Sequence, residues 1–215
     1  MRSYRQFCGL AKSLDVVGDR WTLLIVRELL IRGPSRYSDL RAGLPGIPTN
    51  LLANRLREME AAGLIERDMA SAPTPAALYK LTSRGEALES VIAALGRWAG
   101  PLLAVPEATD VFLPHWLVLP ARLYLVDRTP QGPAVSIEVR DQDERVTLEA
   151  RNGSVRARVG PAKHPDVVVT GPTAIVWQLL IGKIDVARAQ AAGVRIEGRR
   201  AALRRFGPRP PRNAA

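Results

Sequence analysis

Apolar residues in the first part of the chain recur at the spacing of helices. In residues 8–32, CGLAKSLDVVGDRWTLLIVRELLIR, the pattern predicts two helices that separate at Gly18, and Asp19 is placed to cap the second helix. Gly33 and Pro34 predict where the second helix ends. A shorter helix is predicted to follow within SRYSDLRAGLPGI.

The stretch GIPTNLLANRLREMEAAGLIER predicts a helix with two unlike faces. Leu52, Leu56 and Met59 stand at i, i+4 and i+7, so we expect them to face a core, and Gly63 predicts the end of the helix. Polar residues occupy the other faces: Thr49, Asn50, Asn54, Arg55 and Arg57. Their short donors and acceptors suit base edges and phosphates, although an ordinary solvated helix face fits the same residues.

Two β-type runs come next and predict a hairpin. LIERDM and LYKLT are separated by ASAPTPAA, and from Ser83 a further helix, SRGEALESVIAALGRWAGPLL, carries an apolar stripe. The members of that stripe are Leu88, Ile92, Leu95 and Trp98 or Ala99. Helices followed by a hairpin and a closing helix have the order of a winged helix, whose second helix-turn-helix element enters the major groove of DNA.

The period of the pattern changes beyond Leu103. AVPEATD predicts a linker, after which AVSIEV, RVTLEA and SVRARV alternate apolar with other residues, and Asn152-Gly153 predicts a hairpin turn. DVVVTG predicts a nearly continuous apolar strand. It leads into AIVWQLLIGKI, a helix that is apolar almost all round and must be covered on most sides or line a cavity. A small helix, a short strand VRIEG and a terminal helix complete the prediction.

Composition and charge narrow the class of protein. The 215 residues are 47% hydrophobic and 24% charged, enough for one sizeable core or two modest ones. The first residues lack a signal-peptide pattern, and no apolar stretch approaches the ~20 residues of a spanning helix, so we expect a cytoplasmic protein with no membrane association. The formal charge is +10, with six arginines and no acidic residue in 199–215. This excess fits a polyanionic partner, and a solvated surface with a basic tail fits it equally.

The sequence lacks the common catalytic and metal-binding motifs. One cysteine, Cys8, excludes a disulfide framework, and His115 and His164 lie far apart without carboxylates at ligand spacing. No G-x-S-x-G, G-x-x-x-x-G-K-[ST], G-x-G-x-x-G or H-E-x-x-H motif occurs, and the acidic segment DQDER favours a solvated loop. We therefore expect no enzyme activity, no metal and no cofactor.

The motifs of the first half resemble one family of regulators. They are D-x-x-G-x-R-W-T-x-L-I-x-x-E-L from Asp15, R-Y-S-D-L from Arg36 and L-x-x-R-L-x-x-M-E-x-x-G-L from Leu52, with YKLTSRGEAL after the hairpin. From Cys8 to Leu103 the chain resembles the HxlR-type winged-helix transcriptional regulators. The resemblance implies a homodimer that binds double-stranded DNA, with dimer contacts made by the first and closing helices. The candidate DNA-binding residues are Arg36, Ser38, Pro48, Thr49, Asn50, Asn54, Arg55, Arg57, Arg67 and Lys80.

Two features bear on what the resemblance implies. Such regulators commonly place a basic residue at the hairpin tip, whereas SAPTPAA has none and only Arg67 and Lys80 flank it. Cys8 matches a position where some relatives sense oxidants or electrophiles, which requires a lowered thiol pKa; Arg5 and Lys12 help only if the geometry brings them close. A buried cysteine in the dimer interface fits the same position.

The second half resembles the C-terminal part of the sterol-carrier-protein type 2 fold. The words that carry the resemblance are DVVVTGPTAIVWQLLIGKIDVARAQAAGVRIEGRRAAL. The resemblance implies an apolar tunnel for a lipid-like effector, bordered by the helix around Trp177 and by VFLPHWLVLPARLYLV. The candidate ligand-binding residues are Phe112, Trp116, Ile175, Trp177 and Leu180, which would equally well fill a core.

Together these patterns predict an α+β chain with three parts. Residues 1–104 form a winged helix-turn-helix domain, residues 110–206 a sterol-carrier-like domain with a mainly antiparallel sheet, and residues 207–215 a flexible basic tail. We expect a transcriptional regulator, acting as a repressor on a pseudo-palindromic operator. The alternative is a carrier of apolar ligands whose winged helix serves protein association, and steep salt dependence of DNA binding would distinguish the two.

Overall fold

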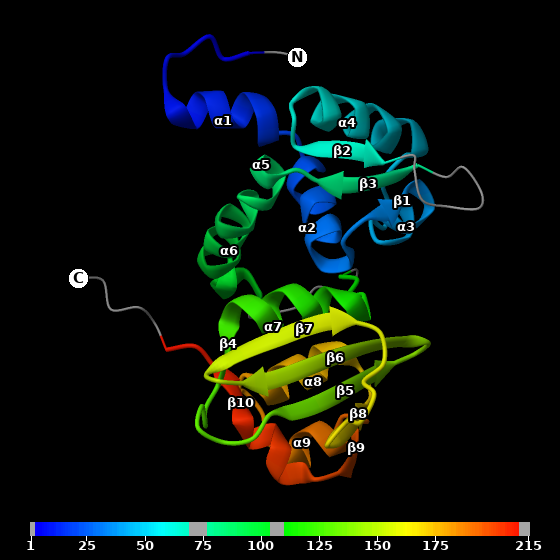
Figure 1. Ribbon diagram of the computed structural model, residues 1–215, viewed down its shortest axis with the longest axis vertical. Helices are drawn as coiled ribbons and strands as arrows, with labels where there is room; N and C mark the ends of the chain where they lie inside the picture. Colours follow the sequence, from blue (N-terminus) through cyan, green and yellow to red (C-terminus); the bar gives the residue numbers. More distant parts are fainter. Residues whose placement is uncertain (1–2, 69–76, 104–109, 211–215) are drawn as a thin grey trace. The chain divides into compact units, whose positions relative to one another are not determined.

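The computed structural model describes residues 3–68, 77–103 and 110–210, and the chain forms two compact units, Met1–Val111 and Phe112–Ala215 (Figure 1). We call them the N-terminal unit and the C-terminal unit. The predicted hairpin tip, most of the predicted linker and the last five residues lie outside the described residues. Within the described ranges, no helix has the length and apolar character needed to cross a bilayer.

The N-terminal unit packs helices against a small antiparallel sheet. Its helices are α1 (Gly9–Val17), α2 (Thr22–Arg32), α3 (Tyr37–Ala42), α4 (Thr49–Ala61), α5 (Ser83–Glu86), α6 (Leu88–Trp98) and the 3-10 helix η1 (Gly100–Leu103). Its strands are β1 (Ser35–Arg36), β2 (Ile65–Asp68) and β3 (Leu78–Leu81), in the order β1-β3-β2. This is the winged-helix order predicted from the sequence.

Helix α4 follows its predicted pattern closely. Leu52, Leu56 and Met59 are each at most 2% exposed and pack with residues of α2 and the sheet. Pro48 is the N-cap residue, and Gly63 adopts φ +67° directly after the C-cap, a conformation that glycine reaches without strain. The hairpin is also confirmed, because Ile65 pairs with Leu81 in an antiparallel register.

Two details of the N-terminal unit differ from the prediction. The N-cap of α2 is Trp21 rather than Asp19, because Asp19 lies in the preceding turn, where its carbonyl accepts the Thr22 N–H. The single closing helix is two helices, α5 and α6, which meet at Ala87. The side chain of Thr82 caps α5 by accepting the Gly85 N–H.

The C-terminal unit is built on one curled sheet (Figure 1). Its helices are η2 (Pro114–Leu117), α7 (Val118–Tyr124), α8 (Thr173–Leu180), α9 (Val186–Ala191) and the 3-10 helix η3 (Arg200–Arg205). Its strands are β4 (Leu125–Asp127), β5 (Val135–Asp141), β6 (Glu144–Arg151), β7 (Ser154–Val159), β8 (Val167–Thr170), β9 (Arg195–Gly198) and β10 (Phe206–Pro208). The order is β10-β4-β7-β6-β5-β8-β9, and of the strand pairs in the described residues only β5 and β8 run parallel. The α+β class with a mainly antiparallel sheet is thus confirmed.

The strand turns follow local chemistry. Asn152 has φ +51° and Gly153 has φ +78°, the positive pair that a two-residue hairpin turn needs between β6 and β7. Along β5 and β6 the apolar residues point to one face, as their period of two predicts. Val167 and Val169 of β8 lie on this buried face, whereas Val168 pairs with Glu138 on the other.

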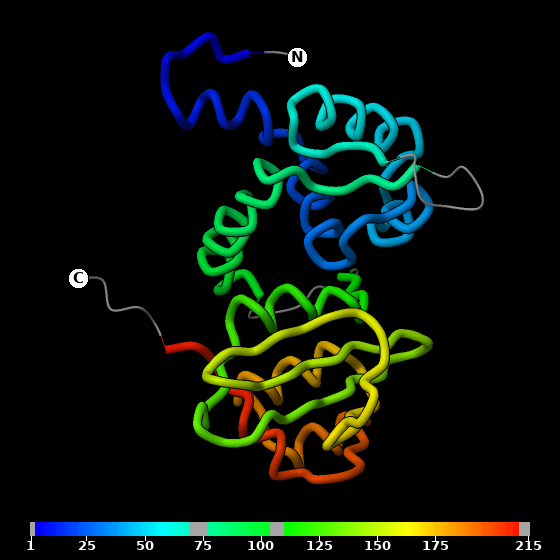
Figure 2. Tube along the Cα trace, viewed as in Figure 1, coloured from blue at the N-terminus to red at the C-terminus, as the bar shows by residue number. Residues whose placement is uncertain are grey.

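The C-terminal end of the chain differs from the prediction. The terminal helix is the 3-10 helix η3, and the chain then returns as β10 to pair with β4, a course that Figure 2 traces in red. Gly207 and Pro208, which we assigned to a flexible tail, therefore lie in the sheet. The Arg205 guanidinium holds this return in place through bonds of 2.7 and 2.9 Å to the Asp127 carboxylate.

Candidate nucleic-acid interface

Helices α3 and α4 form a helix-turn-helix whose second helix is fixed at its first turn. The Tyr37 hydroxyl donates a 2.7 Å hydrogen bond to the carbonyl of Thr49. Between the helices, Gly46 turns the chain with φ +82°. Leu44 and Ile47, buried beside it, anchor the turn in the core. The N-terminus of α4 is therefore tied to α3 and to the core, while Pro48, Thr49 and Asn50 stay exposed.

An open stripe runs along α4 opposite its buried face. Asn50, Asn54 and Arg57 stand at i, i+4 and i+7 and are all exposed. The Arg57 guanidinium donates to the Asn54 side-chain oxygen, and the Asn50 oxygen accepts the Leu51 N–H at 3.0 Å. We call these three residues the α4 stripe. Pro48 and Thr49, at the start of the helix, are exposed as well.

Arg55 does not belong to this stripe, contrary to the prediction. It lies three residues after Leu52 and four before Met59, so it borders the buried face, and its side chain is only 13% exposed. Its guanidinium binds Asp19 and Glu58, each at 2.5 Å. Arg55 thus ties α4 to the turn before α2.

Arg36 and Ser38 lie at the exposed start of α3. Both make contact with Asp39: the Arg36 backbone N–H donates to its carboxylate at 3.1 Å, and the Ser38 hydroxyl lies 3.4 Å from it. The Arg36 guanidinium itself carries no ion pair among the described residues. This places a basic side chain at the N-cap of α3, near the start of the helix-turn-helix.

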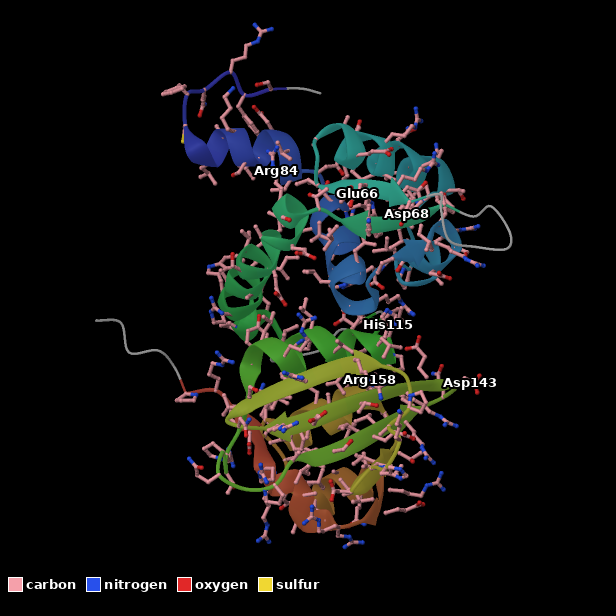
Figure 3. The ribbon with its side chains drawn as sticks, viewed as in Figure 1. Glu66, Asp68, Arg84, His115, Asp143 and Arg158 are labelled. Carbon is pink, nitrogen blue, oxygen red and sulfur yellow. The ribbon has the colours of Figure 1, made fainter. Side chains whose placement is uncertain are left out.

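The cations flanking the wing have acidic or aromatic partners. Lys80 pairs with Glu66 at 3.1 Å and lies 3.9 Å from Asp68, and the hydrogen bond to Glu66 raises the pKa of the Lys80 ammonium. Figure 3 labels these two acidic residues on β2. Arg67 donates to the Tyr79 hydroxyl at 3.1 Å with its guanidinium carbon 5.5 Å from the ring centre. Both predicted wing cations are therefore partly neutralised or held against the hairpin.

Cys8 is exposed and stands at the N-cap of α1. Backbone N–H groups of Ala11 and Leu10 lower the pKa of its thiol, the direction that favours the reactive thiolate. The cause is the open helix end, not the nearby cations that the sequence suggested. In the single chain the thiol is not buried.

Apolar stripes remain exposed on α6 and around α1. On α6, Val91, Leu95 and Trp98 stand at i, i+4 and i+7, and Trp98 is 76% exposed. Phe7, Leu10 and Leu14 form the other stripe, and Phe7 is fully exposed. The predicted stripe of α6 is divided, because Leu88 and Ile92 pack against the core whereas Leu95 and Trp98 do not.

The predicted ligand residues of the C-terminal unit are only partly brought together. Phe112 and Trp116 meet edge to face with ring centres 6.2 Å apart, and η2, which holds Trp116, packs against α8. On α8, Leu180 is buried and Ile175 and Trp177 are half-buried. α8 is therefore covered on most sides, as its apolar character requires.

Two polar pairs with at least one buried member were not predicted from the sequence. His115 is 1% exposed, and its Nδ1 lies 3.0 Å from the partly exposed Glu144. Arg205 and the backbone N–H groups of Thr129 and Gly153 bind the Asp127 carboxylate, with Arg205 the main cause, and hold its pKa at about 2. No group of three or more potential metal ligands occurs among the described residues.

Comparison with known proteins finds relatives of the helix-turn-helix part of the chain. Residues 16–105, which lie within the N-terminal unit, match the HxlR-like helix-turn-helix family. The HTH-type transcriptional regulator YvaP of Bacillus subtilis (strain 168) is 35% identical over 88 residues, which cover 41% of this chain and 81% of YvaP. YkvN of the same strain is 36% identical over 93 residues, 43% of this chain and 78% of YkvN. Among solved structures, the reduced form of the transcriptional regulator YodB from B. subtilis is 29% identical, with 47% of this chain and 100% of that chain covered and a TM-score of 0.41.

Proposed function

The chain belongs to the HxlR-like helix-turn-helix family of DNA-binding transcriptional regulators, and from this premise we propose that it is a homodimeric repressor that reads a pseudo-palindromic operator with α4. The observation that carries the proposal is the α4 stripe. Asn50, Asn54 and Arg57 are exposed on a helix whose opposite face is fixed in the core, so the helix can present them without rearranging.

The side chains of the stripe suit a major groove. Asparagine amides bind adenine edges and arginine binds guanine edges or phosphates, and a groove about 12 Å wide admits one helix. Pro48 and Thr49 at the start of α4, with Arg36 at the N-cap of α3, are placed to approach the DNA backbone. Arg67 and Lys80 contribute less, because their charges are shared with Tyr79 and with acidic neighbours.

The exposed apolar stripes support the dimer. Leu95 and Trp98 on α6, with Leu10 and Leu14 on α1, give a second copy an apolar surface that a soluble monomer would leave in water. Two reading helices related by a two-fold axis then predict half-sites about 10–10.5 bp apart, or a multiple of that spacing.

An apolar effector in the C-terminal unit is the regulatory part of the proposal. The residues we assign to it are Phe112, Trp116, the half-buried Ile175 and Trp177, and the buried Leu180. An effector that changes DNA affinity by some factor must have its own affinity changed by the same factor when DNA binds. A fluorescent fatty acid tests this: bound probe should be displaced or tightened by operator DNA, and an absence of binding by the full chain would remove the effector.

The role of the α4 stripe in operator binding is tested with two variants that each remove one positive charge. Arg57→Ala removes the cation of the α4 stripe, whereas Arg84→Ala removes an exposed cation from α5 of the same unit (Figure 3). We expect Arg57→Ala to weaken operator binding by about 1–3 kcal/mol, or roughly 5-fold to 150-fold, and Arg84→Ala to leave it nearly unchanged. Binding is measured by fluorescence anisotropy against operator and scrambled duplexes.

Equal losses in the two variants would contradict the assignment of α4. A wild-type protein that binds operator and scrambled duplexes alike, while still binding the fatty acid, would favour the alternative function of an apolar-ligand carrier. The salt dependence separates these outcomes, since phosphate contacts weaken steeply as salt rises and apolar binding does not.

A further inference from the structure

The sheet of the C-terminal unit has one apolar and one polar face. On the apolar face, residues such as Ile137, Leu148 and Val169 are fully buried. The register of the ladders places a different set together on the other face of strands β5 to β9. Its charged members are Glu138, Arg140, Arg145, Glu149, Arg151, Arg156, Arg158, Arg195 and Glu197. We call this surface the arginine face.

The arginine face carries a net positive charge that its own acids do not neutralise. Glu138 is 2% exposed and is already bound, at 2.6 Å by Arg140 Nε and at 2.7 Å by the Ala162 N–H. Besides this pair, the face holds two more acidic residues, Glu149 and Glu197, and five more arginines. Of these, Arg145, Arg151, Arg156 and Arg195 make no ion pair among the described residues.

The arrangement places like charges opposite each other. Arg140 and Arg145 are direct partners across β5 and β6, and Arg195 continues the same row beyond Thr170. Like charges at directly paired positions destabilise a sheet, and Glu138, which attracts both guanidinium groups, offsets part of this cost. A bound anion would remove that cost.

We propose that the arginine face binds the phosphate backbone of double-stranded DNA, independently of sequence and separately from α4. Neighbouring strands lie about 4.8 Å apart and alternate residues about 6.7 Å apart, so the face presents a grid of cations to a row of phosphates. The cations are all arginines, whose planar fork binds phosphate oxygens in pairs.

Two observations favour DNA over a membrane surface as the partner. The chain belongs to a family of DNA-binding regulators, so DNA is the polyanion it meets. The face also exposes no large apolar side chain, since Phe112 is the only such residue exposed in the described part of the C-terminal unit, and it does not lie on these strands. Peripheral membrane binding normally combines cations with apolar residues that enter the lipid.

Salt dependence of binding by the full chain tests the proposal. The face variant carries Arg145→Gln, Arg151→Gln and Arg156→Gln, whose side chains make no hydrogen bond among the described residues. The control carries Arg188→Gln, Arg200→Gln and Arg204→Gln on α9 and η3, with the same loss of charge. Each is titrated with a long duplex without operator at several salt concentrations.

We compare the slope of the logarithm of the association constant against the logarithm of the salt concentration. In the face variant the magnitude of this slope should fall by about 2–3, since each lost phosphate contact removes about 0.9. The control variant should change it by less than about 1. Equal changes in both variants, or none in either, would overturn the proposal, provided that circular dichroism shows both folded. Loss of binding to vesicles of anionic lipid with unchanged DNA binding would also overturn it and assign the face to membranes.

The experiments distinguish failure of this proposal from failure of the proposal that the α4 stripe recognises the operator. Arg57→Ala should lose operator preference while retaining the non-specific salt dependence, and the face variant should do the reverse. If the face variant alone abolishes discrimination between operator and scrambled DNA, the arginine face is not a sequence-independent site.

Discussion

The two units differ in what a single copy leaves exposed. In the N-terminal unit, α1 and α6 hold apolar side chains in solvent, among them Leu10, Leu95 and Trp98. In the C-terminal unit the apolar face of the sheet is buried by its own helices, and what remains exposed is the arginine face. All the large apolar side chains exposed among the described residues belong to the N-terminal unit except Phe112.

This difference indicates which unit needs a partner to complete its packing. The core of the C-terminal unit closes on itself, with the buried Asp127–Arg205 pair joining β4 to the end of η3 beside β10. The N-terminal unit has a complete core around Leu52 and Leu56 and a second, uncovered apolar surface. We therefore expect variants of the C-terminal unit to lose stability and variants of the exposed surface of the N-terminal unit to lose dimerisation.

The largest effect is expected from the buried pair of the C-terminal unit. Asp127→Ala leaves the Arg205 guanidinium without its carboxylate, and breaking such a pair typically costs about 3–5 kcal/mol. Differential scanning calorimetry should show the transition of the C-terminal unit lowered, with that of the N-terminal unit unchanged. The control is Asp143→Ala in the exposed turn between β5 and β6 (Figure 3), and an equal effect there would contradict the assignment.

Acid should remove the same stabilisation. The folded-state pKa of Asp127 is about 2, below its ordinary value of 3.8, so the contribution is fully present above about pH 4 and is lost as the pH falls through about 2. The difference in unfolding free energy between wild type and Asp127→Asn should therefore shrink between pH 4 and pH 2. A difference that stays constant over this range would show that the ionised carboxylate is not the source.

Assembly should fail next, when the exposed stripe of α6 is made charged. Leu95→Glu with Trp98→Glu places carboxylates in the surface we assign to the dimer, and loss of an interface anchor costs about 2 kcal/mol or more, roughly 30-fold in affinity. Sedimentation velocity should show monomers that keep the wild-type circular dichroism. The control, Ser90→Glu, lies on another exposed side of α6 and should remain dimeric. If the double variant also remained dimeric, the dimer surface would lie elsewhere.

The smallest effect separates two neighbouring arginines of α4. Arg55→Gln loses its bonds to Asp19 and Glu58, which are partly exposed, so we expect a loss of about 0.2–1 kcal/mol for each pair in urea unfolding. Its preference for operator over scrambled DNA should persist, unlike that of Arg57→Ala. A lost preference with unchanged stability would return Arg55 to the DNA-contacting residues.

Local patterns predicted most of the elements and both faces of α4. Helical spacing located Leu52, Leu56 and Met59 in the core, and the Asn-Gly pair located the turn between β6 and β7. These features depend on residues that are close in the sequence, so the sequence alone is enough to predict them.

Features that join distant segments were not predictable in this way. From the sequence, Arg55 is predicted to be an exposed helix residue. The fold brings Asp19, in the turn before α2, beside it, and this contact cannot be predicted from the local pattern. Likewise β10 has no apolar alternation of its own, and its place depends on Asp127 and Arg205 meeting across the unit. His115 and Glu144 pair in the same long-range manner.

The role of the α4 stripe in reading a two-fold symmetric site is tested by hydroxyl-radical footprinting. The DNA upstream of the gene is probed with wild type and with the double variant Asn50→Ala, Asn54→Ala. We expect two protected half-sites about 10–10.5 bp apart, or a multiple of that spacing, which the double variant loses while remaining folded and dimeric. The same protected pattern from both proteins would contradict it, because the exposed amides of α4 would then carry no sequence information.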